Sequence, residues 1–356
     1  MYIYVPDKLA AKPAVIVAIH HCQGTGTSYY QSTPYSKLAE QYGFIVIYPE
    51  SPYSGTCWDV SSKKSLTHNG GGNSNSIANM VTYTLQKYKG DASKVFVTGS
   101  SSGAMMTVSE TPAQSTSTTH LTTLSLSQNV MAATYPEMFK AATAYSGVPA
   151  GCFVSTANQE AAWNSTCAQG TVQASAQYWA ATVKAMYPGY GGARPRFQVY
   201  HGSADTILRP QNYQETVKEW TGVFGFDAAK PAKSQNNFPA ANYKTDTWGV
   251  TAANPLGTVQ GVYVTGAGHT VPVNGYVGVV AYFRAVIGLD ANSFGQCSGY
   301  EVVRFRLSAA YLTIGFVAHL AGQGLAGQGL AGRPIDWFDW QLGCPRILRA
   351  RFVELR

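Results

Sequence analysis

The chain has 356 residues and a formal net charge of +7, a length that suits one α/β domain with insertions or a tail. Hydrophobic residues make up 45% of it and charged residues only 12%, against a usual charged share of about 25%. This composition argues against a disordered chain, a coiled coil or a nucleic-acid-binding protein. No run reaches the roughly 18 uncharged apolar residues of a membrane span, so we expect a soluble protein with no membrane partner.

The positive charge is spread unevenly. From Ala291 onward, seven Arg and four acidic residues give a net charge of +3, which leaves +4 on the first 290 residues. Those residues show no basic stripe with interleaved aromatic side chains, the pattern that nucleic-acid grooves use. We therefore interpret the excess as a solvated surface and expect no nucleic-acid partner.

Short apolar runs recur along the chain at the spacing of strands that alternate with helices. Their near-continuous β-branched and aromatic content is typical of strands buried on both faces of a parallel sheet. The strand-like runs are Pro13–His20, Phe44–Pro49, Lys94–Gly99, Phe139–Gly147, Arg196–Gly202 and Val259–Gly266, and helical stretches lie at Pro34–Tyr42 and Ser76–Tyr88. The predicted fold class is α/β, with a mainly parallel central sheet flanked by helices. Such sheets bind ligands outside the carboxyl ends of their strands.

Two segments break this pattern. Val108–Gln128 is rich in Ser and Thr and interrupts an otherwise continuous helical stretch. Past about Ser293 the chain holds 7 of its 11 Arg and none of its 14 Lys, with the repeat LAGQGLAGQGLAG. We expect a folded domain over residues 1–292, interrupted by 108–128, and a disordered, low-complexity, Arg-rich tail over 293–356.

The motif Gly99-Ser100-Ser101-Ser102-Gly103 follows a predicted strand and precedes a helical stretch. This is the strand–turn–helix setting of a nucleophile elbow, in which Ser101 projects into the site. Glycines flank the serine because a side chain at either position would collide with neighbouring backbone. The alternative is a plain turn rich in Ser and Gly.

A serine nucleophile needs a base, and the base needs a group that orients it. Asp205 and His269 each follow a later predicted strand, and the order Ser101, Asp205, His269 is that of α/β-hydrolases. The alternatives are that Asp205 only caps the following helix and that His201 is the base. We interpret His201, at a strand end, as a hydrogen-bonded structural residue. The remaining histidines have no supporting context, and no His/Cys/carboxylate cluster has zinc-like spacing, so we expect no metal.

The tetrahedral intermediate of acyl transfer needs hydrogen-bond donors for its oxyanion. The candidates are the backbone N–H groups of Ser102, after the nucleophile, and Cys22, in the glycine-rich loop His21–Gly26. A plain turn is the alternative for that loop. Trp58 lies beyond the next predicted strand and is a candidate substrate-binding wall for a sugar or aryl group, or else a core residue.

The cysteines indicate an oxidising compartment. Cys152 and Cys167 bracket the glycosylation sequon at Asn164, and a disulfide between them would close a short loop. Cys22 and Cys57 are a plausible second pair. The pairing of four cysteines is otherwise left open: Cys22, Cys57, Cys297 and Cys344.

Several stretches of the sequence, which contain the motifs described above, closely resemble the secreted fungal acetylxylan esterases of the first carbohydrate-esterase family. That family also holds feruloyl esterases and relatives of polyhydroxybutyrate depolymerases. The stretches include YIYVPDKLAAKPAVIVAIHHCQGT, VFVTGSSSGAMMT, WNSTCAQG, YHGSADTILRPQNY and VTGAGHTVP, and the resemblance covers about residues 1–107 and 129–290.

The resemblance implies an α/β-hydrolase fold and a serine esterase that uses Ser101, Asp205 and His269, without a cofactor, to remove acetyl groups from xylan outside the cell. It also supports the pairing of Cys152 with Cys167. We expect a monomer acting on acetylated xylan or a related plant cell-wall polysaccharide. The alternatives are a feruloyl esterase on the same triad, a catalytically impaired product of a mis-spliced gene, and a carbohydrate-binding protein without activity.

The chain departs from the family in two places. Family members begin upstream of Met1 with a signal peptide and a first strand, so we expect an N-terminally truncated chain. They also run directly from Met-Met-Thr into Asn-Val-Met, whereas 21 residues intervene here. Val108–Gln128 has codon possibilities that fit splice signals, and we interpret it as a translated intron. An insertion that starts at Val108, with six residues between it and Ser101, is expected to shift the nucleophile turn and lower activity.

Overall fold

The computed structural model describes residues 1–106, 130–271, 339–340 and 348–349. The chain divides into two units, Met1–Gly288 and Leu289–Arg356, and each is described by itself. The second unit contributes one antiparallel pair, β10 (Asp339–Trp340) with β11 (Leu348–Arg349). The predicted domain boundary at residue 292 lies outside the described residues and stays a prediction.

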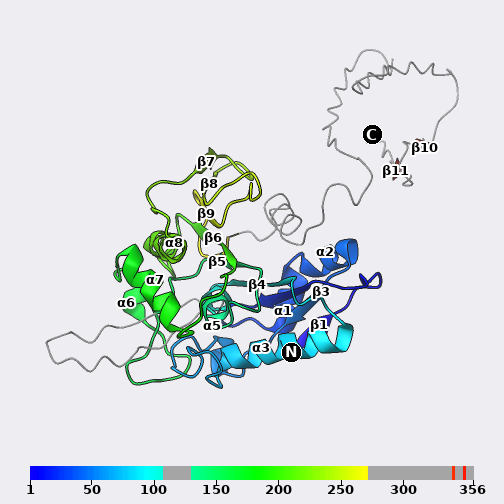
Figure 1. Ribbon diagram of the computed structural model, residues 1–356, viewed down its shortest axis with the longest axis horizontal. Coiled ribbons are helices and arrows are strands. Elements are labelled where there is room, and N and C mark those ends of the chain that lie inside the picture. Colours follow the sequence, from blue (N-terminus) through cyan, green and yellow to red (C-terminus); the bar gives the residue numbers. More distant parts are fainter. Residues whose placement is uncertain (107–129, 272–338, 341–347, 350–356) are drawn as a thin grey trace, which may run out of the picture. The chain divides into compact units, whose positions relative to one another are not determined.

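Strands of the first unit form a single sheet, in which the order of the nine described strands is β1-β3-β2-β4-β5-β6-β9-β8-β7 (Figure 1). The strands from β3 to β9 in this order run parallel, and β1, β8 and β7 are antiparallel additions at the two edges. Their bounds are β1 (Tyr2–Tyr4), β2 (Val15–Ile19), β3 (Ile45–Tyr48), β4 (Val95–Ser100), β5 (Ala141–Tyr145), β6 (Arg196–Gly202), β7 (Lys233–Asn236), β8 (Tyr243–Trp248) and β9 (Val259–Val264).

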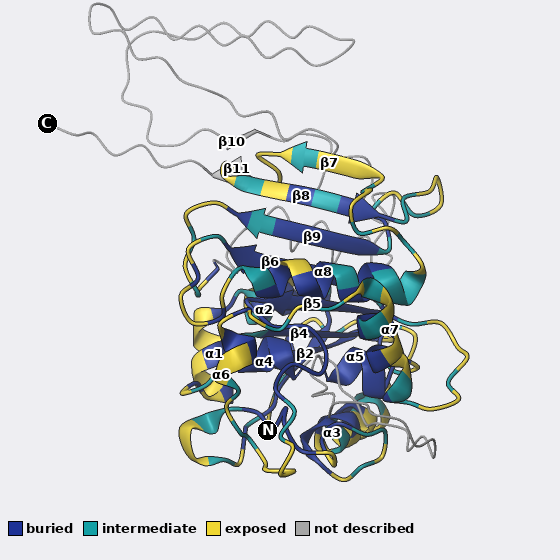
Figure 2. Cartoon of the chain, turned by 90° about the vertical axis from the view of Figure 1, so that its left-hand side faces the viewer, coloured by how far each residue is buried: buried dark blue, intermediate teal, exposed yellow. Residues whose placement is uncertain are grey.

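All six predicted strands are confirmed, as β2, β3, β4, β5, β6 and β9. They are nearly continuous in apolar residues because both of their faces are covered, and almost all of their residues are buried, as Figure 2 shows for β4 and β5. The sequence patterns missed β7 and β8. β7 has the polar sequence KSQN and lies exposed at the sheet edge, where a strand needs no apolar run.

The described helices lie between the strands. The predicted helices are confirmed as α2 (Tyr35–Tyr42) and α3 (Asn73–Tyr88). The others are α1 (Gly26–Ser32), α4 (Ser102–Met105), α5 (Met131–Thr134), α6 (Ser165–Ala168), α7 (Ala176–Ala185) and α8 (Gln211–Phe224), with a short 3-10 helix at Ser54–Thr56.

Helices cover both faces of the sheet, which gives the α/β architecture that the sequence predicts. On one face, Val97 of β4 joins a continuous apolar core with residues of α3, α4, α5, α7 and α8. On the other face, the Thr98 hydroxyl lies 3.1 Å from the hydroxyl of Tyr35, at the start of α2. Successive residues of one strand therefore contact opposite layers, as a strand covered on both sides requires.

The short helices α4 and α5 form two parts of one helix. The N–H of Val130 donates to Met105 O, and the N–H of Met131 donates to Met106 O, both at 2.9 Å. Each pair is 25 positions apart in the sequence, whereas an α-helical hydrogen bond joins residues four apart. The excess is 21 residues, which equals the length of the insertion predicted from the sequence.

The expected shift of the nucleophile turn does not occur, and that prediction is wrong for this structure. Met105 and Met106 before the break, and Val130 and Met131 after it, are at most 2% exposed and lie in the same apolar core. Burial of these four side chains holds the two helix segments in one register. The proposed intron, Val108–Gln128, itself lies outside the described residues.

Deleting Val108–Gln128 should join α4 and α5 into one continuous helix. Closing a loop of this length costs on the order of 2–3 kcal/mol of conformational entropy, so the free energy of unfolding should rise by about that amount. Urea unfolding of the full chain and the deletion variant measures the difference.

A deletion of only 19 residues, Glu110–Gln128, is the matched control. It leaves two extra residues in the helix, which rotates α5 by about 200° relative to the core. This variant should be less stable than the 21-residue deletion. A 21-residue deletion that is less stable than the full chain would contradict the shared register.

Candidate active site

The nucleophile candidate, Ser101, occupies a sharp turn between β4 and α4. Its backbone has φ 54° and ψ −120°, a conformation that a residue with a side chain rarely adopts. The Ser101 N–H donates to Tyr145 O of β5 at 2.9 Å, which anchors the turn to the neighbouring strand. Such backbone strain costs of order 1–3 kcal/mol and persists only where surrounding contacts enforce it.

Both glycines of the motif are required by close backbone approaches, which confirms the reason predicted for them. A Cβ added at Gly99 would lie 2.4 Å from Gly103 O. One added at Gly103 would lie 2.2 Å from Ile19 O and 2.5 Å from His20 O, at the end of β2. The turn can therefore form, and rest on β2, only with hydrogen at both positions.

The structure brings the three candidate triad residues together. The Oγ atom of Ser101 lies 2.8 Å from Nε2 of His269, and Nδ1 of His269 lies 2.8 Å from Oδ2 of Asp205. Both contacts, from Ser101 to His269 and from His269 to Asp205, are therefore of hydrogen-bond length. The Asp205 side chain is fully buried, and that of His269 is 23% exposed. The imidazole thus connects a buried carboxylate to a serine at the end of the sheet.

Hydrogen bonds between the loops after β6 and β9 hold the acid and the base in place. The N–H of Ala204 donates to Ala267 O at 2.8 Å, and the N–H of Gly266 donates to Ser203 Oγ at 2.8 Å. A Cβ added at Gly202 would lie 2.3 Å from Ala267 O. The two loops therefore pack backbone against backbone, which places His269 beside Asp205.

The electrostatic environment keeps the Asp205 carboxyl ionised. Burial alone would raise its pKa, but hydrogen bonds from His201 and His269, together with the backbone N–H of Leu208, lower the pKa well below the usual value. Oδ1 accepts from the N–H groups of Ile207 and Leu208, both at 2.9 Å. Both N–H groups lie before α8, which begins at Gln211 with Pro210 at its N-cap and no side-chain cap, so the alternative that Asp205 only caps this helix is wrong.

The loop proposed to supply an oxyanion donor is fastened to the segment after β3. Cys22 and Cys57 form a disulfide, the pairing that the sequence made plausible. The N–H of Gln23 donates to Gly55 O at 2.8 Å, and the indole N–H of Trp58 donates to His20 O at 2.9 Å. Three separate contacts thus fix the loop over residues 20–23.

Trp58 is not the wall of a substrate site, and that prediction is corrected. The side chain is among the largest fully buried ones of the described residues and belongs to the apolar core. Its ring packs beside His20 at 5.1 Å between centroids. The sequence placed Trp58 near the site correctly, but its contact is with the loop backbone.

Two other histidines, His20 and His68, have structural surroundings, and His120 and His319 lie outside the described residues. Burial lowers the pKa of His20, and its Nε2 accepts from the N–H of Ser51 at 3.3 Å. His68 stacks on Tyr187 at 3.7 Å between ring centroids. Within the described part of the chain, no group of three or more His, Cys, Asp or Glu residues could hold a metal ion.

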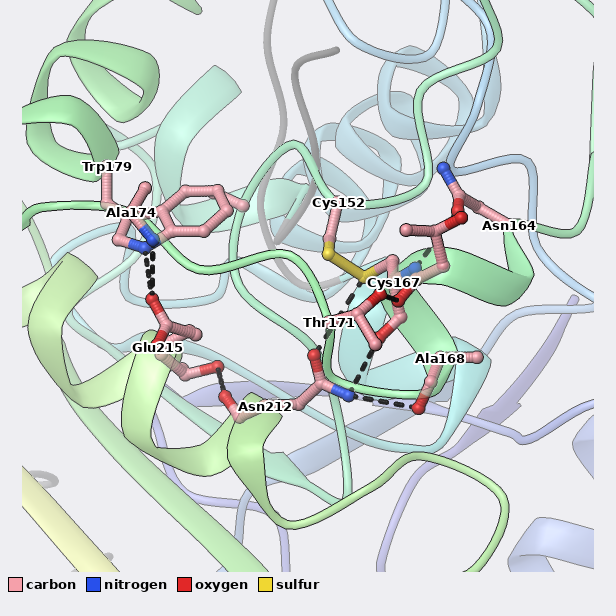
Figure 3. Close-up of a disulfide and its surroundings, with 12 residues drawn as sticks. Cys152, Asn164, Cys167, Ala168, Thr171, Ala174, Trp179, Asn212 and Glu215 are labelled. Atoms are coloured by element: carbon pink, nitrogen blue, oxygen red, sulfur yellow. Dashed lines mark hydrogen bonds between the residues drawn. A yellow bond between two sulfur atoms is a disulfide. The ribbon is translucent and has the colours of Figure 1, made fainter.

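The second predicted disulfide, between Cys152 and Cys167, is confirmed (Figure 3). Asn164 caps α6 because its Oδ1 accepts from the N–H of Cys167 at 3.0 Å. The buried Asn212 of α8 donates to Cys167 O at 3.1 Å and to Ala168 O at 3.3 Å. The disulfide loop is thereby attached to α8.

One neighbour of the nucleophile escaped the sequence patterns. The hydroxyl of Tyr29, in α1, lies 2.8 Å from Ser100 Oγ, next to Ser101, and the Tyr29 side chain is 2% exposed. Burial raises the pKa of this phenol, which therefore stays neutral. A tyrosine in a short helix carries no sequence signal for such a contact between distant segments.

Comparison with known proteins identifies relatives that are esterases by name. The family model for esterase PHB depolymerase matches residues 1–111. A probable acetylxylan esterase A of Aspergillus clavatus is 62% identical over 275 residues, which cover 77% of this chain and 80% of that relative. Acetylxylan esterase A of Aspergillus awamori is 59% identical over 275 residues, covering 77% and 81%. The solved structure of the acetyl xylan esterase from Aspergillus awamori matches with a TM-score of 0.70 and 57% identity, over 81% of this chain and 93% of that one.

The parallel sheet and the contacts at its carboxyl edge define an α/β-hydrolase, and the chain is a carboxylic ester hydrolase. The high identity over most of both chains shows its family. The chain belongs to the fungal acetylxylan esterase A family. No helix in the described residues has the length and apolar content needed to cross a membrane.

Gly103→Ala should disrupt the site. The added Cβ would meet the backbone of Ile19 at 2.2 Å, and such overpacking lowers the free energy of unfolding by about 1–3 kcal/mol. Because the turn must shift by a fraction of an ångström or more, kcat for ester hydrolysis should fall by about 100-fold. Gly191→Ala, where an added Cβ meets nothing within 4 Å, is the control. Retention of wild-type kcat in Gly103→Ala would refute the close-approach argument.

Proposed function

We propose that the chain removes O-acetyl groups from xylan by an acyl-enzyme mechanism in which Ser101, His269 and Asp205 form the catalytic triad. The observation that carries this proposal is the continuous path from Ser101 Oγ through His269 to Asp205 Oδ2, with 2.8 Å at both contacts. A buried ionised carboxylate at the end of this path favours the imidazole tautomer with its proton on Nδ1. Nε2 is then free to accept the serine proton.

The reaction has two halves. Ser101 Oγ attacks the acetyl carbonyl carbon as its proton passes to His269 Nε2, and the same proton then goes to the departing xylosyl oxygen. The product of this half is acetyl-Ser101 and a free sugar hydroxyl. In the second half, His269 Nε2 takes a proton from water as the water oxygen attacks the acyl carbon. The same proton then passes to Ser101 Oγ as the bond between Oγ and the acyl carbon breaks, which releases acetic acid and restores the free serine. Asp205 stays ionised throughout and orients the imidazole.

The N–H groups of Ser102 and Cys22 are the proposed donors for the oxyanion of both tetrahedral intermediates. Ser102 is the first residue of α4, so its N–H has no partner within the helix. Across the described residues, neither N–H donates to a protein acceptor. Ser102 precedes Gly103 and Cys22 follows β2, so the two free N–H groups belong to the two segments that meet at Gly103. An oxyanion site requires such unpaired backbone donors.

The substrate is inferred from the relatives, whose names specify acetylxylan esterase. Because these relatives, at about 60% identity, are acetylxylan esterases by name, the feruloyl esterase alternative is not favoured. The two disulfides support an oxidising, extracellular location. The proposal also includes a monomer, with N-glycosylation at Asn164, whose cap uses Oδ1 and leaves the amide nitrogen for the glycan.

Acetate and ferulate release from acetylated, feruloylated arabinoxylan tests the proposal. The wild-type chain should release acetate, and Ser101→Ala should reduce kcat by at least about 1,000-fold because no acyl-enzyme can form. Ser100→Ala, one residue away, is the control and should keep most of the activity. Acetate release that survives Ser101→Ala would refute the mechanism, and release of ferulate in place of acetate would refute the substrate.

Trp58→Phe tests the oxyanion loop. The change removes the indole N–H that donates to His20 O. Because the loop that carries the proposed donor Cys22 is then held less firmly, kcat should fall roughly tenfold with KM little changed. Trp248→Phe is a matched control, because Trp248 is also buried and donates to a carbonyl, Asp227 O, at 3.0 Å. Each variant should lose about 1 kcal/mol of stability. An equal loss of kcat in the two variants would contradict a role for this contact in catalysis.

A further inference from the structure

His201, the penultimate residue of β6, contacts the proposed triad acid at Oδ2, the same carboxylate oxygen that His269 contacts. Its side chain is fully buried. Nε2 lies 2.8 Å from Leu208 O and 3.2 Å from Asp205 Oδ2. Sequence reasoning correctly treated this histidine as hydrogen-bonded, but it did not identify the carboxylate as one of the partners.

The two contacts assign the proton of His201. A backbone carbonyl and an ionised carboxylate are both acceptors, so the nitrogen that faces them must carry hydrogen. Nδ1 is buried and has no partner among the described groups. The ring therefore holds its proton on Nε2, where it is shared between Leu208 O and Asp205 Oδ2.

The carboxylate of Asp205 is consequently held at both oxygens. Oδ1 accepts from the N–H groups of Ile207 and Leu208, and Oδ2 accepts from His201 and His269. Leu208 closes a ring of contacts, because its N–H binds the carboxylate and its C=O binds the imidazole of His201. Rotation of the carboxyl group would break a hydrogen bond on each side.

We propose that His201 is a positioning residue for the esterase reaction, whose Nε2–H fixes the Asp205 carboxylate in the orientation that aligns His269 with Ser101. The inference rests on the proposed triad and adds a second histidine to it. His201 touches neither the substrate nor the reacting atoms. It acts through Asp205, so its removal should slow the chemical steps without weakening substrate binding.

A pair of substitutions separates positioning from packing. His201→Leu fills the space without a donor, whereas His201→Gln places an amide N–H near the position of Nε2. For acetate release, kcat of His201→Leu should fall by about 10- to 100-fold with KM within about twofold. His201→Gln should recover most of that loss. His68→Leu is the matched control, since His68 also contacts a carbonyl, Thr134 O, at 2.5 Å, and it should leave kcat unchanged.

The outcomes are distinct. Equal kcat losses in His201→Leu and His201→Gln, or a loss that follows thermal stability across all three variants, would overturn the inference. Acetate release that survives Ser101→Ala would instead overturn the proposed mechanism. The position of the His201 proton can also be measured on the wild-type chain, so this test does not depend on whether a variant folds. Nitrogen and carbon NMR shifts of the histidine rings should show one fully buried imidazole with its proton on Nε2, and a proton on Nδ1 of His201 would refute the assignment.

Discussion

The site depends on one close contact between two backbone segments, at Gly103, where any side chain would collide with β2. Because the Cα of Gly103 rests on the backbone of Ile19 and His20, the start of α4 lies directly against the end of β2. That contact sets the distance between the strained turn at Ser101 and the loop that carries Cys22. The turn and the loop cannot move independently, so the nucleophile and the proposed oxyanion donors share one rigid support.

The proposed acid and base, Asp205 and His269, are positioned in the same way on the other side of β5, by a glycine that allows a close backbone approach. Gly202 permits the loop after β9 to approach within contact distance, as Gly103 does for β2. Between the two contacts, hydrogen bonds continue the sheet beyond the strand ends: Ser101 N to Tyr145 O, Ser146 N to Tyr200 O, and Ser203 N to Val264 O. This short ladder connects the nucleophile turn to both other loops, so the triad geometry is an extension of the sheet itself.

Local patterns in the sequence predicted the parallel strands and the sharp turn at Ser101, because each depends on neighbouring residues. Apolar runs indicate buried strands, and a Gly-flanked serine after one of them indicates a sharp turn. The contacts of Trp58, Tyr29 and His201 join distant segments, and a residue type alone does not specify them. Trp58 shows the limit most clearly, since an aromatic residue near a site is equally suited to bind a ligand or to support the loop that does.

The interruption after Met106 shows how local the support of the nucleophile is. The backbone contacts that fix the turn at Ser101 lie before the break or on another strand: the packing of Gly99 and Gly103, and the hydrogen bond to Tyr145. The helix beyond Met106 contributes apolar burial, and Val130 and Met131 supply it in the correct register after 21 additional residues. An insertion at this point therefore changes the connection between two helical segments and removes none of these contacts. The same insertion placed a turn earlier would separate Gly103 from β2 and remove the constraint from which the site is built.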